Sequence, residues 1–476
     1  MAKLILKRGR EGRILAGHPW IYRGEVAEIV GEWRADEAVT VLDGHGRFVG
    51  QGFYNPRASL CCRLLTRQDE PVDRAFFRAR VDAALAYRSH TGLVGSAFRW
   101  AWSEADNLAG LVVDRYGPVA VLQCLTLGMS RIRPWLVEAV KEVGGVEHVY
   151  LHDDPTAARL EGFEPELGWA EGAGPREVEI QEGACRFLVP IEGGQKTGFY
   201  LDQRENRPRV AAFAGGRRVL DAFCYTAAFS CHALLAGAGE ALCVESSPES
   251  LALARRTLDL NGVGAKAQCR EVNAFDELRR LDRAGERFGL VVLDPPPFTR
   301  RKDALEAAIR GYKEINLRGL RLLEPGGILA TFSCSYHVTP ALFEEICRAA
   351  AADAGVSVRV LATLSQARDH PVLLTVPETR YLKGLLLERA QEIRRRPASA
   401  RCFRRWRSAD AFVDAASTSA LLTRFPNKSF YLPAAYTVVV EREGAENEHE
   451  EGDAGGEDGK DLKKAHGSPP GGAAHP

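Results

Sequence analysis

The second half of the chain alternates apolar strand candidates with amphipathic helix candidates, and this alternation restricts the fold more than any other feature. The series starts near residue 191, with a strand expected at Val219–Phe223 and a helix at Ala227–Ala236. Consecutive parallel strands need a long crossover connection, which a helix usually supplies. We therefore expect an α/β domain with a doubly wound, mainly parallel, Rossmann-like sheet over residues 191–392. Further strands are expected at Ala241–Glu245, Lys266–Val272, Leu290–Leu293, Ile328–Phe332, Val372–Val376 and Tyr381–Leu387, and further helices at Pro248–Leu260, Phe275–Arg283, Asp303–Leu322 and Ala341–Ala354.

Two smaller modules are expected before this domain. Residues 1–72 contain short β-prone runs separated by turn residues, which predicts a small all-β module. Residues 73–190 are expected to contain a linking helix, Asp73–Arg88, followed by a small central α/β domain. The runs in the first module are Val26–Val30, Ala38–Leu42, Phe48–Tyr54 and Leu60–Leu65; the second has strand candidates at Leu111–Tyr116, Val119–Leu125, His148–His152, Glu177–Ile180 and Cys185–Val189 and a helix candidate at Ile132–Val143.

The C-terminal part of the chain has a different composition. Residues 441–476 are rich in Glu, Gly, Asp and Pro, which predicts a disordered acidic tail. That tail carries ten acidic and four basic residues, so the net charge of +0 hides 59 basic against 53 acidic residues in the rest of the chain. The excess suits an anionic partner, although an ordinary mixed surface explains it equally well. Residues 393–440, with the arginine clusters 394–396 and 404–407, are interpreted as a basic extension.

Several classes of protein are excluded by what the sequence lacks. No apolar run reaches the roughly 18 residues of a membrane span, and the N-terminus has no signal-peptide pattern, so we expect no membrane contact and a cytoplasmic location. The eleven cysteines include no C-x-x-C pair, which argues against a zinc ribbon, a disulfide framework or another metal site.

Polar residues at three successive strand ends indicate a nucleotide-like ligand. Asp221 is followed by a turn of mostly small residues that lacks the G-x-G-x-x-G pattern of dinucleotide folds. An acid and a close backbone suit S-adenosylmethionine, Glu245 suits ribose hydroxyls, and Asn273 suits an adenine edge. Each residue alone could be a solvated cap, but three in order favour this cofactor. The expected cofactor-binding residues are Asp221, Ala222, Phe223, Tyr225, Thr226, Glu245, Ser246, Asn273, Ala274 and Asp294.

Two later strand ends carry the candidate catalytic residues. Asp294 follows Leu290–Leu293 and Cys334 follows Ile328–Phe332, so neighbouring parallel strands would place an acid and a thiol beside one crevice. Methylation of a pyrimidine ring carbon requires this pair of groups. Enzymes that methylate amino groups place an aromatic residue where this chain has Pro297, which disfavours amino methylation. The alternatives are a buried structural thiol and a rigid turn.

Several motifs together resemble one known family. The run from Lys196 to Arg204, KTGFYLDQR, combines with Asp294-Pro295-Pro296, Ser333-Cys334-Ser335 and Asp369-His370-Pro371. With these motifs, the chain resembles the class I S-adenosylmethionine-dependent 23S rRNA (cytosine-C5)-methyltransferases. The resemblance covers residues 1–390 and implies an N-terminal PUA domain, S-adenosylmethionine as cofactor and 23S ribosomal RNA as partner. It departs from the family at Ala227-Ala228, where the family usually has glycines.

The resemblance also implies roles for single residues. Cys334 would attack C6 of an extruded cytosine and Asp294 would contact the ring near N3, while the base that removes the C5 proton is not identified. Methylation of another atom, such as guanine N7, and a non-catalytic RNA-binding assembly factor are the alternatives. The sequence leaves open the nucleotide, the form of the RNA substrate, and whether two copies form a homodimer. The RNA-binding candidates are Arg8, Arg10, Arg23, Lys196 and Arg204, with Phe298 or Tyr200 as a base-stacking ring.

Overall fold

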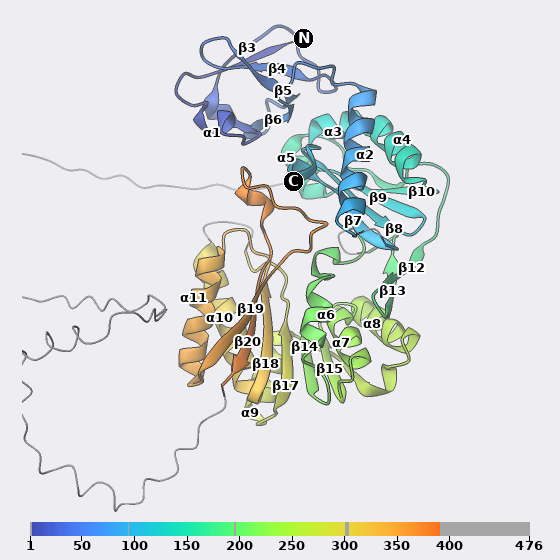
Figure 1. The fold of residues 1–476 in the computed structure, drawn as a ribbon, viewed down its shortest axis with the longest axis vertical. Coiled ribbons are helices and arrows are strands. Elements are labelled where there is room, and N and C mark those ends of the chain that lie inside the picture. The colour runs from blue at the N-terminus through green and yellow to red at the C-terminus, as the bar shows by residue number, and fades with distance from the viewer. Residues whose placement is uncertain (1, 94, 195–196, 300–303, 391–476) are drawn as a thin grey trace, which may run out of the picture. The chain divides into compact units, whose positions relative to one another are not determined.

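The computed structural model describes residues 2–93, 95–194, 197–299 and 304–390. Within these residues the chain forms a six-stranded sheet, a five-stranded sheet, a two-stranded hairpin and a seven-stranded sheet (Figure 1). The basic extension and the acidic tail expected over 393–476 lie outside the described residues. No helix in the described part of the chain is long and apolar enough to cross a membrane.

The six-stranded sheet is built from the first 66 residues, in the order β2-β6-β5-β4-β1-β3. The expected all-β character of this module is confirmed, but two short strands were not predicted individually. One of them, Lys3–Leu6, pairs with β3 on one side and β4 on the other, so its place depends on distant residues. The elements are β1 Lys3–Leu6, α1 Gly12–Leu15, β2 Trp20–Tyr22, η1 Arg23–Glu25, β3 Val26–Val30, β4 Val39–Leu42, β5 Phe48–Tyr54 and β6 Leu60–Thr66.

A long helix and a five-stranded sheet, in the order β11-β10-β9-β8-β7, form the central α/β part. Asp73 caps the helix, because its Oδ1 accepts a hydrogen bond from the backbone N–H of Phe76 at 3.0 Å. The hairpin that follows shares a hydrophobic core with the last sheet. The elements are α2 Arg74–His90, β7 Ala97–Trp102, η2 Ser103–Asp106, β8 Leu111–Tyr116, β9 Val119–Cys124, α3 Leu127–Arg131, α4 Arg133–Gly144, β10 His148–His152, α5 Pro155–Glu161, β11 Leu167–Trp169, β12 Glu177–Glu182 and β13 Cys185–Pro190.

The seven-stranded sheet has the order β16-β15-β14-β17-β18-β20-β19. The first five strands in this order are parallel, whereas β20 is antiparallel to both of its neighbours. This is the mainly parallel, doubly wound sheet that the alternation predicted. The elements are η3 Leu201–Gln203, α6 Asn206–Ala211, β14 Arg218–Ala222, α7 Ala228–Leu235, β15 Glu240–Glu245, α8 Pro248–Leu260, η4 Gly264–Lys266, β16 Ala267–Glu271, α9 Ala274–Arg283, β17 Phe288–Leu293, α10 Leu305–Leu322, β18 Leu323–Ser333, α11 Pro340–Ala354, β19 Val358–Ser365, η6 Pro377–Thr379 and β20 Lys383–Arg389.

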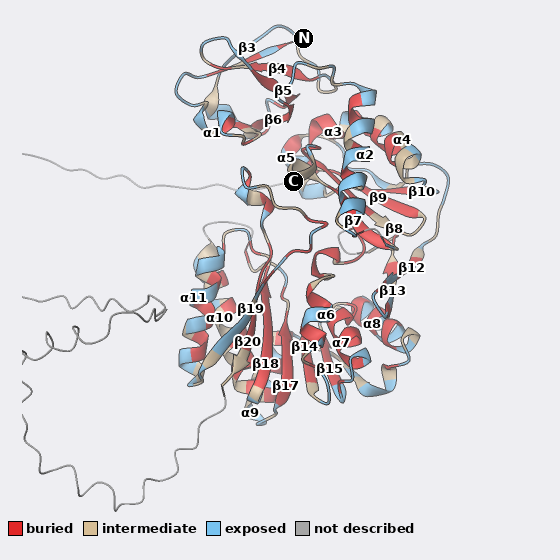
Figure 2. Ribbon diagram, viewed as in Figure 1, coloured by how far each residue is buried: buried red, intermediate tan, exposed pale blue. Residues whose placement is uncertain are grey.

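Alternating side chains of the central strands enter two different cores. On β14, Val219 belongs to the core that contains α7 and α8, while its neighbour Leu220 belongs to the core that contains α9, α10 and α11. Strands β17 and β18 are apolar on both faces, and Figure 2 shows them buried along most of their length. Burial on both faces explains why these strands read as continuous apolar runs.

In the seven-stranded sheet, one expected strand was wrong and one was missed. Val372–Val376 is β-prone, but Pro371 and Pro377 flank it and it forms a turn closed by a single bridge between Leu373 and Val376. The antiparallel partner of β20 is instead Val358–Ser365. That strand lies at the sheet edge and most of its side chains are partly or fully exposed, so it lacks the apolar signal of the central strands.

A buried carboxylate, Asp369, connects the central part with the seven-stranded domain. Its Oδ2 accepts hydrogen bonds from the backbone N–H of Arg99 at 3.1 Å and from Arg204 Nη1 at 3.4 Å. The backbone carbonyl of Asp369 accepts a further bond from Arg88 Nη2 at 2.7 Å. Burial disfavours the charged form, but His370 and Arg204 outweigh it and lower the pKa of Asp369 to about 2.

We predict that Asp369→Ala lowers the free energy of unfolding by about 3 kcal/mol or more, because it leaves a partly buried guanidinium without its partner. Since the folded pKa lies below the ordinary value, this contribution is complete above about pH 4 and is lost as the pH falls toward 2. Equilibrium urea unfolding would measure both effects. Arg368→Ala is the control, because Arg368 is 63% exposed in its ion pair with Glu205 and should cost less than about 1 kcal/mol. Equal costs for the two variants would contradict the account.

Candidate functional site

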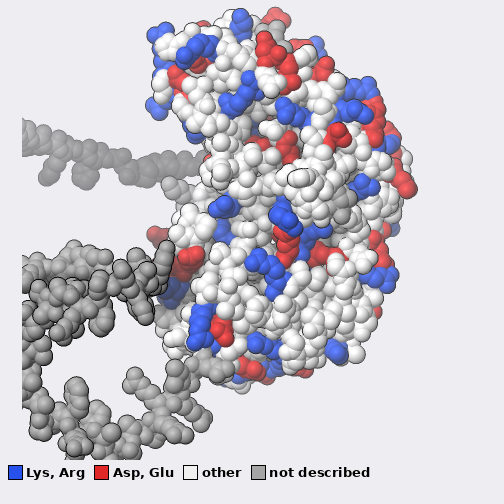
Figure 3. Space-filling view, in the orientation of Figure 1, with Lys and Arg blue, Asp and Glu red and all other residues white. Residues whose placement is uncertain are grey.

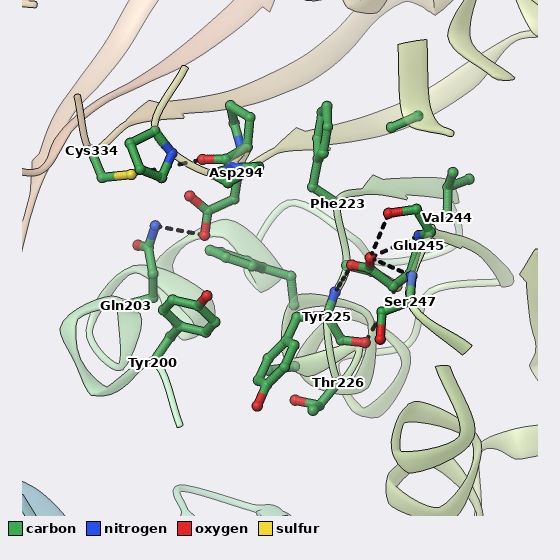
Figure 4. Close-up of a pocket in the computed structure, with 18 of the residues that line it drawn as sticks. Tyr200, Gln203, Phe223, Tyr225, Thr226, Val244, Glu245, Ser247, Asp294 and Cys334 are labelled. Atoms are coloured by element: carbon green, nitrogen blue, oxygen red, sulfur yellow. Dashed lines mark hydrogen bonds between the residues drawn. The ribbon is translucent and has the colours of Figure 1, made fainter. Parts of the chain in front are cut away.

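A cavity of about 440 Å³ opens at the carboxyl ends of β14, β15, β17 and β18. The chain order of the strands reverses between β14 and β17, and open α/β sheets bind their ligands at such a switch point. Figure 4 shows the side chains from these strand ends and from the segment before α6 converging on the space. The expected residues among its lining are Phe223, Tyr225, Thr226, Glu245, Ser246, Asn273, Ala274, Asp294, Phe298 and Cys334, with Tyr200 as the second stacking candidate.

The turn between β14 and α7 is held in an unusual backbone conformation. Phe223, Tyr225 and Ala227 have φ values of 65°, 50° and 58°, in the left-handed region that glycine adopts most easily. Non-glycine residues in this region cost free energy and cluster at functional sites. The turn therefore adopts a glycine-like path although this chain has Ala227 and Ala228 where the related family usually has glycines.

Glu245 organises the next strand end. Its Oε2 accepts a hydrogen bond from the backbone N–H of Tyr225 at 3.0 Å, and Oε1 accepts from Ser246 N at 2.7 Å and Ser247 N at 3.0 Å. Oε1 also accepts from the Ser246 hydroxyl at 3.3 Å, whereas Oε2 accepts only the Tyr225 bond among these and so keeps an acceptor position for a ligand. Glu245 is thus fixed by two loops while it faces the ligand space.

Asp221 and Ala222, which were expected to bind the cofactor, lie behind the cavity wall rather than on it. Asp221 is 1% exposed. The Asp221 Oδ2 accepts hydrogen bonds from the backbone N–H of Ser230 at 3.1 Å and from its hydroxyl at 2.7 Å. The residue therefore ties strand β14 to helix α7, and burial raises its pKa to about 6. The strand end was predicted correctly, but the direction of the Asp221 side chain was not.

Asn273 and Ala274 stand at the start of α9, on the cavity wall. The Asn273 Oδ1 accepts a hydrogen bond from the backbone N–H of Phe275 at 2.9 Å, which caps the helix. Phe275 also lines the cavity and was missed, because it was assigned only to the helix. Its ring lies 5.4 Å from that of Phe298, so an aromatic wall borders this end of the cavity.

Asp294 and Cys334 meet as the sequence predicted for neighbouring strand ends. Strands β17 and β18 are parallel with Leu293 beside Thr331, so both residues enter the same cavity. Cys334 is half-buried, and its Sγ lies 3.8 Å from the carbonyl oxygen of Pro295. Figure 4 shows Gln203 beside the pair; its Nε2 donates to Asp294 Oδ2 at 3.0 Å.

The residues that follow Cys334 do not face its cavity. Ser335 is fully buried and its Oγ lies 2.9 Å from Tyr312 Oη. His337 lines a different cavity with Tyr336 and Arg380. Gln203 was missed as a partner of Asp294, although it lies in the run from Lys196 to Arg204 that carries the family resemblance.

The two candidate stacking rings differ in their freedom. Phe298 packs against Tyr312, with ring centroids 4.4 Å apart, and against Phe275. Tyr200 lines the cavity near Asp294 and contacts Tyr225 edge to face at 5.1 Å (Figure 4). Tyr200 is therefore the better placed ring beside the acid and the thiol.

The predicted RNA-binding arginines fall into two groups. The guanidinium groups of Arg204 and Arg23 are bonded within the protein, whereas Arg8 and Arg10 are exposed. Arg204 is largely buried and bonds the carbonyls of Leu93 and Ala97 besides Asp369, so it joins parts of the chain rather than presenting a cation. Arg23 donates to three backbone carbonyls. Arg8 donates to Gly44 O and, like Arg10, is exposed. Lys196 lies outside the described residues. Figure 3 shows basic and acidic side chains interspersed on the face in view.

The cavity suits a ligand with polar and apolar parts. Thr226 Oγ1 is buried on its wall and has no hydrogen-bond partner among the described residues, so it is available to a ligand. Glu245 supplies a negatively charged acceptor, and Phe275 and Phe298 supply an apolar wall. These groups match the charged amino acid, ribose and adenine parts of S-adenosylmethionine.

Comparison with known proteins agrees with this geometry. A PUA-like domain model matches residues 4–67, and an S-adenosylmethionine-dependent methyltransferase model matches residues 163–376. A relative named ribosomal RNA large subunit methyltransferase I, from Alteromonas mediterranea, is 39% identical over 81% of this chain and 98% of its own length. One from Klebsiella pneumoniae with the same name is 38% identical over 80% and 97%.

Solved structures share the fold. A candidate SAM-dependent methyltransferase from Streptococcus mutans superposes with a TM-score of 0.70 at 19% identity, over 82% of this chain and all of that one. A second structure, of a candidate methyltransferase complexed with SAH, gives a TM-score of 0.71 at 20% identity over the same shares. The cofactor of this chain is S-adenosylmethionine.

We predict that Glu245→Gln weakens the binding of S-adenosylmethionine about tenfold or more, because hydrogen bonds to a charged group contribute about 1.5–3 kcal/mol. Asp221→Asn, which keeps an acceptor for Ser230, should bind within about threefold of the wild type. Isothermal titration calorimetry on both variants measures the difference. A larger loss in Asp221→Asn than in Glu245→Gln would show that Asp221 contacts the cofactor after all.

Proposed function

Because the chain belongs to the ribosomal RNA large subunit methyltransferase I family, we propose that it methylates C5 of a cytosine in 23S rRNA through a covalent adduct with Cys334. The observation that supports this assignment is the meeting of a thiol and a carboxylate in the cofactor cavity, at the ends of β17 and β18. Methylation at guanine N7 needs no thiol there, and a non-catalytic assembly factor needs neither group.

The thiol gives C5 the nucleophilic character that it lacks in the free base. The Cys334 thiolate forms a bond to C6, and electron density flows through the ring to N3. Asp294, as a carboxylic acid, donates its proton to N3 and then pairs with the N3–H as a carboxylate. C5 thereby becomes a carbon nucleophile. S-adenosylmethionine would supply the methyl group as an electrophile, with S-adenosylhomocysteine as the leaving group.

The adduct is then resolved by elimination. A base removes the proton from C5, the electron pair of that C–H bond forms the C5–C6 double bond, and the C6–S bond breaks to regenerate the thiolate. N3 returns its proton to Asp294. Gln203 holds the Asp294 carboxyl group through its 3.0 Å hydrogen bond, so this group faces the ring in one orientation.

Three loops would hold the cofactor. The left-handed turn with Tyr225 and Thr226 faces the amino acid part, Glu245 faces the ribose, and Asn273 with Phe275 faces the adenine. The target cytosine would have to leave its helix or loop to reach Cys334, because enzymes that act on a base take it out of the stack. Tyr200 would stack against the extruded ring.

The N-terminal module would dock the RNA around the target. Exposed Arg8 and Arg10 are the phosphate contacts proposed in that module, since the Arg23 and Arg204 guanidinium groups are used within the protein. We place the reaction in the cytoplasm, where 23S rRNA is assembled. Methylation assays with free 23S rRNA and with assembly particles would distinguish the two forms of the substrate.

We predict that Cys334→Ala abolishes formation of 5-methylcytosine while S-adenosylmethionine binding stays within about threefold, since Cys334 touches the base and not the cofactor loops. Labelled methyl transfer to undermodified 23S rRNA, followed by nucleoside mass spectrometry, measures the product. Normal production of 5-methylcytosine by Cys334→Ala would refute the thiol mechanism, and a labelled guanine would refute the assigned base.

A second variant tests the carboxyl group separately. Asp294→Asn keeps the bond acceptor for Gln203 but cannot donate a carboxylic proton to N3. We expect the rate of methyl transfer to fall by about a hundredfold or more, within the range of general acid catalysis, with cofactor affinity little changed. An undiminished rate would remove Asp294 from the chemistry.

A further inference from the structure

Lys383 is a buried lysine next to the segment that carries Cys334. It starts strand β20, and its backbone pairs with Ser333, the residue before Cys334. The side chain is only 6% exposed. Its Nζ donates hydrogen bonds to the carbonyl oxygen of Ser335 at 2.6 Å and of Tyr381 at 2.8 Å. The ammonium group is thus attached to the residue that follows the thiol.

A buried ammonium group without a nearby negative charge is costly. Among the described residues, no carboxylate forms a salt bridge with Lys383, and its two bonded partners are neutral carbonyls. Lys383 also lines a second cavity with His337, Glu378 and Arg380, where the Glu378 carboxylate is paired with His18 at 3.1 Å. The negative group that interacts with it electrostatically is the thiolate form of Cys334. The countercharge for the lysine is therefore the group that the proposed mechanism needs in its ionised form.

We propose that Lys383 is a positioning residue that stabilises the Cys334 thiolate, so that the resting enzyme holds a Lys383 ammonium beside a Cys334 thiolate. This inference rests on the proposed role of Cys334 as nucleophile and adds the source of its activation. A thiol becomes a nucleophile when a neighbouring positive charge favours the thiolate.

The other titratable groups near Cys334 act in the opposite direction or carry no charge. Tyr200, Tyr312 and Tyr381 face it from the segment before α6, from α10 and from the start of β20, and the thiolate helps to raise the pKa of each. Asp294 shares its cavity and, when ionised, disfavours a thiolate. The remaining charged residues of the cavity wall are Asp202, Arg207 and Glu245, of which Arg207 is bonded to both oxygens of Glu182.

The Lys383 ammonium can stabilise the Cys334 thiolate only over a defined pH range. Burial lowers the pKa of Lys383 to about 8, and the Cys334 thiolate opposes this shift. Below about pH 8 the lysine is charged and favours the thiolate. Above that pH the lysine loses its proton and its influence on the thiol disappears. The thiolate is therefore favoured at neutral pH, where a free thiol with a pKa of about 8.5 is mostly protonated.

The experiment is the pH dependence of alkylation of Cys334 in the full-length enzyme without RNA, from about pH 5.5 to 9. Iodoacetamide reacts with the thiolate, and peptide mass spectrometry separates Cys334 from the other cysteines. For the wild type we expect a midpoint at least one pH unit below the value of about 8.5 for a free thiol. A wild-type midpoint at or above that value overturns the proposal without any variant.

Lys383→Met, which keeps an unbranched side chain one atom shorter but removes the charge, should move the midpoint upward by about one unit. The alkylation rate at pH 7 should then fall about tenfold. Lys383→Arg should restore most of the wild-type profile, because it keeps a cation. Tyr381→Phe is the matched control: it alters the same neighbourhood, removes a hydroxyl bonded to Asp202, and should leave the midpoint unchanged.

A Lys383→Met profile that superimposes on that of the wild type, in a protein with normal thermal unfolding and S-adenosylmethionine binding, overturns the proposal. This result is distinct from failure of the thiol mechanism. If the thiol mechanism were wrong, Cys334→Ala would still transfer the methyl group, and the alkylation profile of the wild type would be unaffected. A merely structural role for Lys383 would lower activity without moving the pH midpoint.

Discussion

The parallel pairing of β17 with β18 is the constraint on which the rest of the site depends. Leu293 lies beside Thr331, so the two strands end at the same edge of the sheet and deliver Asp294 and Cys334 to one cavity. Burial of both strands on both faces fixes this register, because a slip of one residue would exchange the two cores. The chemistry of the enzyme is thus positioned by the packing of its most apolar strands.

The segment from residues 197 to 207 connects this edge to the rest of the molecule. Gln203 donates to Asp294, Asp202 accepts from the hydroxyl of Tyr381, and Arg204 bonds Asp369. Neighbouring residues of one short stretch therefore hold Asp294, the start of β20 and the central domain. This explains in physical terms why a nine-residue run can mark a family: a change in it would disturb several contacts at once.

The sequence predicted what local patterns determine and missed what distant contacts determine. The strand–helix alternation gave the sheet, and the strand ends gave Glu245, Asn273, Asp294 and Cys334 at the cavity. The direction of Asp221 toward α7 could not be predicted, because it depends on the packing of a helix against a strand. The edge strand β19 was missed because exposed strands lack a continuous apolar pattern, and Lys383 because its burial results from antiparallel pairing with β18.

The most direct test of the account is to trap the bond between Cys334 and the RNA. Undermodified 23S rRNA containing 5-fluorocytidine, incubated with the enzyme and S-adenosylmethionine, should form a stable protein–RNA adduct. Fluorine replaces the C5 hydrogen, so no proton can be removed from C5 and elimination is blocked. Nuclease digestion and mass spectrometry should locate the nucleotide on the peptide that contains Cys334. An adduct on another residue, or no adduct with an enzyme that methylates normal rRNA, would contradict the central claim that the two strand ends form a thiol-dependent methylation site.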